Sequence, residues 1–449
     1  MSEIKKPAGK YRYRILALLF AATSINYFDR SLMGIMSPEL IEWFGWTNAD
    51  YGKILVAFQI AYAIGMLTMG SIIDRLGTRK GYVLSIGLWS MFGMLHAAIG
   101  RGFSLIGFSA ARFGLGFGES GNFPAAIKTT AEWFPRKERA FATGIFNAAT
   151  AIGAIAAPVV IGGIPGVIPG IVSWSGGERG VGELQHWRYP FLITGALSAI
   201  WVVLWLKTYR KPEEHPKLTK EELDYINSDS VAEATVTPLS WAKVLPKRQT
   251  WAFALAKITD AVWWFYLFWG AIFLARTFDV DIKHMGAPFF VIYAIADTGS
   301  IFGGWLSGNF MSRGWSVNKA RKLTLLICAL LILPVCFVAM TDNKWLAIVL
   351  IGIGAAGHQA WSANIFTLVS DVFPKKATAS VVGIGGMVGA LAGMVSSYAL
   401  GKTLDQAGNT GFFWAFLIAG SLYSVILLFV HLLMPHMRPL DDNLEPVDE

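Results

Sequence analysis

Long apolar stretches alternate with short polar ones along almost the whole chain. Each apolar stretch carries few charges and runs for roughly 20 residues, the length that an α-helix needs to cross a bilayer. A backbone in lipid must satisfy its own hydrogen bonds, and the pattern lacks the short alternating segments of barrel strands, so these stretches are predicted to be membrane-spanning helices. The twelve predicted spans are 14–36, 51–73, 81–100, 103–128, 140–163, 188–207, 251–275, 286–310, 323–341, 345–370, 379–403 and 411–433.

The longest polar interruption lies between the sixth and seventh spans. It runs from Lys207 to Thr250. A short amphipathic helix is expected inside it around Leu218–Ile226, with Thr219 as its N-cap and acidic residues in its first turn. Such a linker allows the six spans before it to move relative to the six spans after it.

The two sets of six spans resemble each other. The sequence after the fourth span, Trp133–Ala140, returns after the tenth as Val372–Ala379, which indicates a duplication. We therefore expect an all-α membrane protein made of two pseudo-symmetric six-helix bundles with a site between them. The predicted boundaries are 1–207 for the first bundle, 208–250 for a cytoplasmic linker, 251–433 for the second bundle and 434–449 for a cytoplasmic tail.

Composition and charge add an orientation to this picture. The chain is 54% hydrophobic and only 15% charged, outside the range of soluble globular domains. With both termini in the cytoplasm, most of the 38 basic residues fall in cytoplasmic segments, as expected for a multi-pass protein of an inner membrane. We attribute the net charge of +8 to this topology and to anionic lipid headgroups, and we expect no nucleic-acid partner.

A basic loop between the second and third spans carries the clearest motif, GSIIDRLGTRK at Gly70–Lys80. Gly70 permits close helix approach, Asp74 can cap a helix or pair with a basic side chain, and Gly77 permits a tight turn. The run resembles the signature loop of the major facilitator superfamily, G-x-x-x-D-R-x-G-x-R-R/K, with every defining position filled; an ordinary basic turn is the alternative. The resemblance implies a gating role for Gly70, Asp74, Arg75, Gly77 and Arg79, and gate contacts are also expected from Glu138 and Arg139.

Two membrane spans carry a narrower resemblance. Asn26–Arg30 reads NYFDR and Arg112–Glu119 reads RFGLGFGE, and both are similar to the anion:cation symporter branch, most closely to bacterial hexuronate (glucuronate and galacturonate) symporters. The resemblance covers essentially the whole chain and implies proton-coupled import of a sugar acid anion by alternating access. Lys257 is a departure, because an arginine is common there. Further similar stretches are Gly121–Lys128, Trp133–Ala140 and Ala356–Asn364.

Charged residues within the predicted spans form a functional shortlist, because a charge inside the membrane needs an interior partner or a water-filled cavity. Its members are Asp29, Arg30, Arg112, Glu119, Lys257 and Asp297. In keeping with the resemblance, Asp29 and Glu119 are expected to carry protons and Arg112 to switch their proton affinity. Arg30 is expected to anchor the substrate carboxylate, since its planar fork binds a carboxylate at two points.

Simpler interpretations stay open for several of these charges. Arg112 with Glu119 suits a static buried ion-pair network as well; the two lie about two helical turns apart, so Arg112 is expected nearer to Asp29 than to Glu119. Lys257 is expected to supply a second positive group, and snorkelling to the membrane surface is its alternative. For Asp297, bonding between helices is the preferred account.

A sugar acid also needs hydrogen-bonding groups for its hydroxyls and a flat apolar wall. Polar and aromatic side chains on the predicted spans supply both, and interhelical hydrogen bonding is the alternative role for each of them. The candidates are Tyr27, Gln59, Tyr62, Asn147, Trp264, His358, Gln359, Trp361, Ser362 and Asn364.

Other functions remain alternatives to hexuronate symport. The competing interpretations are transport of galactonate or another aldonate, anion exchange, and ligand sensing without transport. The acids Asp29 and Glu119 argue against anion exchange, which needs no titrating acid. The sequence lacks a Walker loop and any His/Cys cluster with metal-ligand spacing, so no enzyme activity, metal or other cofactor is expected. The expected partners are a small organic anion, protons and membrane lipid, with the monomer as the functional form. The Gly- and Pro-rich segment Gly162–His186 is assigned no chemistry.

Overall fold

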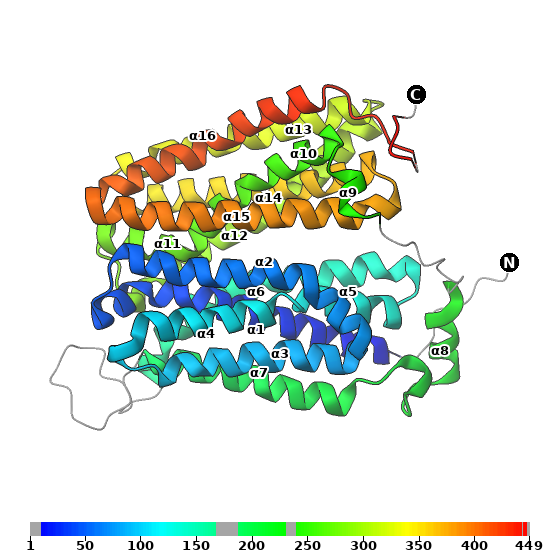
Figure 1. Cartoon of the computed structure of the whole chain (residues 1–449), viewed down its shortest axis with the longest axis horizontal. Coiled ribbons are helices and arrows are strands. Elements are labelled where there is room, and N and C mark those ends of the chain that lie inside the picture. Colours follow the sequence, from blue (N-terminus) through cyan, green and yellow to red (C-terminus); the bar gives the residue numbers. More distant parts are fainter. Residues whose placement is uncertain (1–9, 168–186, 230–238, 442, 447–449) are drawn as a thin grey trace. The chain divides into compact units, whose positions relative to one another are not determined.

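The structure is a computed structural model that describes residues 10–167, 187–229, 239–441 and 443–446 (Figure 1). Within these ranges nearly the whole chain is helical, as the hydropathy pattern predicts. Most of the Gly- and Pro-rich segment Gly162–His186 lies outside the described residues.

The first six predicted spans appear with one break. Glycine is a poor helix former, and the fourth span is interrupted at Ser120 and Gly121, where the Ser120 hydroxyl donates to the carbonyl of Phe117 at 2.7 Å. The helices are α1 (Tyr11–Phe44), α2 (Asn48–Leu76), α3 (Thr78–Leu95), α4 (Ser104–Glu119), α5 (Asn122–Trp133), α6 (Arg136–Val167) and α7 (Arg188–Thr208).

The seventh span is also broken. A 3₁₀ turn at Lys257–Thr259 separates its two parts, and the Thr259 hydroxyl donates to the carbonyl of Ala256 at 2.7 Å. The helices after the linker are α9 (Trp241–Val244), α10 (Arg248–Ala256), α11 (Asp260–Phe278), α12 (Gly286–Ser312), α13 (Val317–Ile332), α14 (Lys344–Val372), α15 (Lys375–Ala407) and α16 (Thr410–Leu433).

Length and apolar character identify nine membrane-spanning candidates among the described residues, one of which, Asn48–Ala98, covers both α2 and α3. Two of the predicted spans are not among them. The middle of α1 carries Asn26, Asp29 and Arg30, and the fourth span is divided between the short α4 and α5. These departures from a plain apolar helix fall where the sequence places its functional charges.

The described helices belong to two compact units. The first unit comprises residues 1–32, 60–157 and 164–235, and in it α3 packs against α4 and α7. The second unit comprises 33–59, 158–163 and 236–449, and in it α12 packs against α14 and α13 against α16. The bundle, linker and tail boundaries given by the sequence stay a prediction.

The expected linker helix is present as α8 (Lys220–Ile226), and the Thr219 hydroxyl caps it by accepting from the Glu222 amide at 3.2 Å. Its Glu222 side chain reaches the buried Arg12 of α1, with Oε1 3.3 Å from Nη1. Arg12 also pairs with Glu138 at 3.0 Å. Burial and a hydrogen bond to Glu138 raise the pKa of Tyr225 to about 12, so this hydroxyl stays protonated and keeps donating to Glu138.

Replacing Glu222 with alanine is expected to destabilise the first unit. The change leaves buried Arg12 with less compensating charge, at a cost on the order of 2 kcal/mol. Thermal unfolding in detergent should show a lower midpoint for this variant. Glu221→Ala is the matched control, because Glu221 lies in the same helical turn but is exposed. Equal midpoints for the two variants would contradict the anchoring role.

Candidate functional site

The first unit contains a buried ion pair between α1 and α4. Arg30 Nε lies 2.9 Å from Glu119 Oε2, and the two side chains are 4% and 0% exposed. Arg30 Nη2 also donates to the side chain of Asn26 at 3.4 Å. Glu119 is the last residue of α4, so the break in the fourth span sets the position of this carboxylate. The site therefore joins a predicted substrate anchor directly to a predicted proton carrier.

Two tyrosines flank the Arg30 guanidinium. The ring of Tyr27 lies 4.8 Å from Arg30 Cζ and the ring of Tyr62 lies 4.7 Å from it. Aromatic faces attract a guanidinium and are flat apolar surfaces. The structure thus brings together Tyr27, Tyr62 and Arg30, which the sequence analysis assigned to substrate binding.

Asp29, next to Arg30 on α1, has its partners on α7. Its buried carboxylate accepts a hydrogen bond from the Ser198 hydroxyl at 3.5 Å. The nearby Thr194 hydroxyl donates to the carbonyl of Phe191 at 3.3 Å. The sequence analysis missed both hydroxyls. Thr194 and Ser198 stand four residues apart in an apolar span, a spacing that puts them on one helix face, and this was the available signal.

Arg112 lies fully buried on α4. It is within electrostatic reach of both Asp29 and Glu119. The expectation that Arg112 lies nearer to Asp29 than to Glu119 stays a prediction. The carboxylate of Glu119, however, makes its ion pair with Arg30 of α1, a partner that the sequence analysis did not propose.

The second unit contains an ion pair at the break of the seventh span. Lys257 Nζ lies 2.6 Å from Asp260 Oδ2, and the side chains are 7% and 25% exposed. Lys257 caps the C-terminus of α10 and Asp260 begins α11, so each charge is favoured by the dipole of its own helix end. The Lys257 ammonium also lies 4.5 Å from the ring centre of Phe366. Lys257 is therefore held inside the protein and does not snorkel to the surface.

A hydrogen-bonded chain lies beside this pair. The Tyr423 hydroxyl lies 3.3 Å from the carbonyl of Thr259, to which it donates, and its oxygen is hydrogen-bonded to His358 Nδ1 at 2.7 Å. The His358 ring stacks on Trp263 with centroids 5.5 Å apart and is within electrostatic reach of Asp260 and Lys257. His358 and Lys257 are thus brought together as substrate candidates.

The remaining substrate candidates make packing contacts or are at least partly exposed. Asn364 of α14 is buried and donates to the carbonyl of Gly303 on α12 at 3.0 Å, which is the interhelical alternative given above. It also donates to the carbonyl of Ala360 on its own helix at 2.9 Å. Trp361 and Trp264 are buried among aromatic rings, and Gln59 donates to Ser397 at 3.4 Å. Asn147 is exposed on α6, while Gln359 and Ser362 on α14 and Asp297 on α12 are partly exposed.

The residues of the signature loop that are predicted to act in gating lie at the end of α2 and the start of α3. Gly77 adopts φ 76° between α2 and α3, which confirms the tight turn. Asp74 pairs with Lys128 of α5 at 2.6 Å, so the charge-pairing option holds here. Arg75 is exposed, and Arg79 donates to the Leu206 carbonyl at 2.6 Å.

Glu138 and Arg139, which are also predicted to act in gating, make contacts at the start of α6, whereas the expected contact at Gly70 is missing. Glu138 pairs with Arg12, and Arg139 donates to the carbonyls of Phe134 and Ala131 at 3.1 and 2.9 Å. The close helix approach expected at Gly70 is not found, because no atom of the described residues lies within 4 Å of the place where a Cβ would stand. A gating role for Gly70 remains a prediction.

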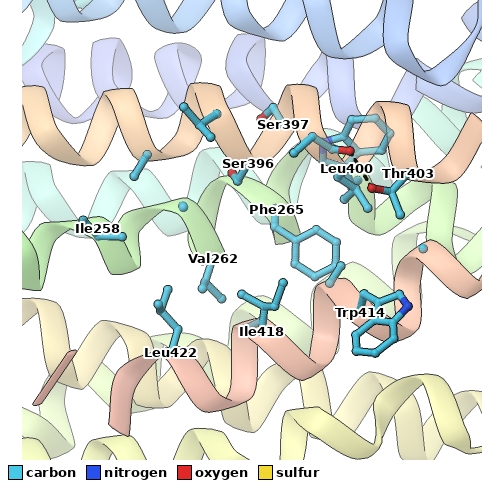
Figure 2. A pocket seen from close by; sticks show the side chains of 18 of the residues that line it. Ile258, Val262, Phe265, Ser396, Ser397, Leu400, Thr403, Trp414, Ile418 and Leu422 are labelled. Carbon is cyan, nitrogen blue, oxygen red and sulfur yellow. Dashed lines mark hydrogen bonds between the residues drawn. The ribbon is translucent and has the colours of Figure 1, made fainter. Parts of the chain in front are cut away.

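An apolar cavity of about 550 Å³ lies between α11, α15 and α16 (Figure 2). Figure 2 shows Val262, Phe265, Ile418 and Leu422 in its wall, with Ser396 and Ser397 as minor polar members. None of the predicted substrate or proton residues lines it. Because it lacks charged groups, this cavity suits hydrocarbon and not a sugar acid.

Comparison with known proteins decides the family. The family model described as Major Facilitator Superfamily matches residues 19–397. The chain belongs to this superfamily. It is therefore a multi-pass membrane transporter and not an enzyme, and its helices form the major facilitator fold expected from the sequence.

Individual relatives agree with this assignment. The chain is 32% identical over 408 residues to a hexuronate transporter of Escherichia coli strain K12, covering 90% of each chain. It is 28% identical to a probable galactarate/D-glucarate transporter of the same strain, covering 94% of this chain and 93% of the relative. A bacterial homologue of the human lysosomal transporter Spinster, solved in an inward-facing and occupied conformation, has the same fold, with a TM-score of 0.73, 18% identity and 96% and 98% coverage.

Proposed function

We propose that this major facilitator protein is a proton-coupled symporter that imports a hexuronate, glucuronate or galacturonate, by alternating access. The observation that carries the proposal is the buried ion pair between Arg30 and Glu119. The 32% identity to a hexuronate transporter supports the choice of substrate class. We further propose that the protein acts as a monomer in the bacterial inner membrane with both termini in the cytoplasm.

Coupling follows from competition for one guanidinium. A substrate carboxylate that binds Arg30 at two points takes the counter-charge away from Glu119. A buried carboxylate without a counter-charge is strongly disfavoured, so Glu119 then binds a proton. Substrate anion and proton therefore enter the site together, and neither is stable there alone.

Asp29 and Arg112 extend this exchange. Asp29 accepts a hydrogen bond from Ser198 of α7 and lies within electrostatic reach of Arg112 and Glu119. A proton that arrives on Glu119 weakens its repulsion of Asp29, so the two acids titrate as a coupled pair. Tyr27 and Tyr62 supply aromatic walls beside the bound carboxylate.

Uptake into vesicles tests the proposal. The purified protein is reconstituted into liposomes, and entry of labelled glucuronate, galacturonate and galactonate is followed with and without an inward proton gradient. The proposal predicts that the proton gradient drives accumulation of one or both uronates inside the liposomes, and that a protonophore abolishes this accumulation. Preference for galactonate would reassign the substrate to an aldonate. Uptake that requires a trapped internal anion and ignores the gradient would show an exchanger instead.

A further inference from the structure

We propose that the apolar cavity of the second unit binds one acyl chain of a membrane phospholipid, with the lipid phosphate held at one end by Lys402 and Trp414. The inference does not depend on which solute the protein transports, because all of the residues that carry it lie in the second unit. They fall within stretches that are long and apolar enough to cross a membrane. The cavity therefore lies at a depth where hydrocarbon surrounds a membrane protein.

The cavity is elongated along the helices. From Val388 to Thr403 it follows α15 for about 22 Å, at 1.5 Å per residue. Figure 2 shows Ile258 and Leu422 at one end of the cavity and Thr403 and Trp414 at the other. One leaflet contributes about 15 Å to a hydrocarbon core of about 30 Å, and its acyl chains run roughly parallel to the spanning helices. The cavity thus has the length and the direction of an acyl chain.

The cavity opens along an exposed face of α15. Leu391 and Val395 line it, are exposed, and lie one helical turn apart on the same face. On α16, Ile418 also lines the cavity and is exposed. A hydrocarbon chain can therefore enter from the side, between α15 and α16, without a movement of either helix.

Small side chains on α16 create the hollow. Gly411, Ala415 and Ala419 line it at a spacing of four residues, which puts them on one helix face. Two of the polar side chains in the lining, Ser396 and Thr403, donate to carbonyls of their own helix at 2.9 Å. An empty hollow costs its lining dispersion contacts, and water finds few partners in an apolar one. An acyl chain restores the contacts without burying a polar group.

A lysine continues the exposed face of α15 beyond the apolar cavity. Lys402 lies about three helical turns after Leu391, so the two side chains share this face. Lys402 is exposed and directly precedes Thr403, which marks the end of the cavity. Its ammonium lies 4.9 Å from the ring of Tyr398, and it forms no ion pair with the residues that the structure describes. A positive charge is therefore available beside the end of the cavity.

The neighbours of Lys402 favour a phosphate as its partner. Trp414 lines the same end of the cavity and is exposed, its indole N–H can only donate, and tryptophan prefers the level of the lipid headgroups. Asp405, the acid in the next turn, already accepts from the backbone amides of Asn48 and Ala49 at 2.8 Å. An ammonium and an N–H donor at the end of a hydrocarbon-sized cavity match a phosphate joined to an acyl chain.

Photolabelling tests the site. The purified protein is reconstituted into phosphatidylcholine liposomes that contain a small fraction of phosphatidylglycerol with a diazirine near the end of one acyl chain. After illumination, mass spectrometry locates the label along the sequence. The peptides of α15 and α16 that line the cavity are expected to carry severalfold more label than α7, whose Ile200 and Leu204 are also exposed.

Two kinds of variant separate the acyl chain from the headgroup. Ala415→Trp fills the cavity and is expected to remove the excess label, and Ala392→Phe repeats this test if the first variant does not fold. Ala199→Trp, at an exposed position of α7, is the matched control and should leave the excess unchanged. Lys402→Gln is expected to lower the excess about fivefold, the effect of one lysine near anionic lipid. Lys283→Gln, an exposed lysine of the same unit, controls for loss of charge in general.

Several results would overturn the inference. Label spread evenly over the exposed helices would show annular lipid only, and an excess that survives both cavity-filling variants would place the chain elsewhere. A diacylglycerol probe has the same chains without a phosphate, so it is expected to give less excess label and to ignore Lys402→Gln. Equal labelling by the two probes would remove the role assigned to the phosphate. These results do not involve glucuronate uptake, so they are distinct from a failure of the proposed function.

Discussion

Glu119→Gln will abolish the accumulation of glucuronate that a proton gradient drives. Glutamine keeps the shape of the side chain and can still accept from Arg30 Nε, but it cannot exchange a proton. A gradient of about one pH unit supplies about 1.4 kcal/mol per proton, enough for about tenfold accumulation at one proton per anion. The variant is expected to reach only equal concentrations inside and outside, and labelled uptake at a fixed gradient measures this difference.

A counterflow assay shows whether the Glu119→Gln protein has lost only proton coupling or has failed to fold. Exchange of internal for external glucuronate moves no net protons, so the Glu119→Gln protein is expected to continue it at a measurable rate. Glu42→Gln is the control, because Glu42 is an exposed acid at the end of α1. If the Glu119→Gln protein concentrates glucuronate as the wild-type protein does, Glu119 is not the proton carrier.

Arg30→Ala will remove substrate binding, and with it both uptake and counterflow. The guanidinium is the group that can hold a carboxylate at two points between the faces of Tyr27 and Tyr62. Counterflow is expected to fall by about 100-fold, in line with the loss of a charge-assisted bidentate contact of about 3 kcal/mol. Arg30→Lys should retain part of the rate, since lysine keeps the charge and loses the planar fork.

Stability must be followed alongside binding in the Arg30 variants. Removing Arg30 leaves the buried Glu119 without its ion-pair partner, which costs about 3–5 kcal/mol in comparable buried pairs. The double variant Arg30→Ala/Glu119→Gln removes the unpaired charge and is expected to recover thermal stability while it still fails to bind glucuronate. If the unfolding midpoint of the folded Arg30→Ala protein rises when glucuronate is added, the variant still binds glucuronate, and the anchoring role is contradicted.

The fold could be predicted from the sequence because its cause is local. Each span needs its own length of apolar residues, so hydropathy alone located the helices, and Thr219 was recognised as the cap of α8. The breaks at Ser120–Gly121 and Lys257–Thr259 were not predicted. Each interrupts a stretch that stays apolar enough to be read as a single helix, and only the hydrogen bonding of the surrounding turns shows where the helix stops.

The candidate site could be predicted in its membership but not in its pairings. Charges in apolar spans identify Arg30 and Glu119 one by one, but their ion pair joins residues 89 positions apart, which no local spacing reveals. Asp260 was overlooked although it stands three residues after Lys257, because the shortlist was drawn from isolated charges. Asn364 was predicted to bind substrate, but its side-chain amide donates hydrogen bonds to backbone carbonyls of α12 and α14.

Proton movement caused by the substrate tests the central claim most directly. Liposomes that contain the wild-type protein and an internal pH indicator are prepared without any pH gradient, and glucuronate is added outside. If substrate and proton can occupy the site only together, the interior will become more acidic as glucuronate enters, and liposomes with Glu119→Gln will not acidify. Entry of labelled glucuronate into wild-type liposomes at constant internal pH would contradict the account.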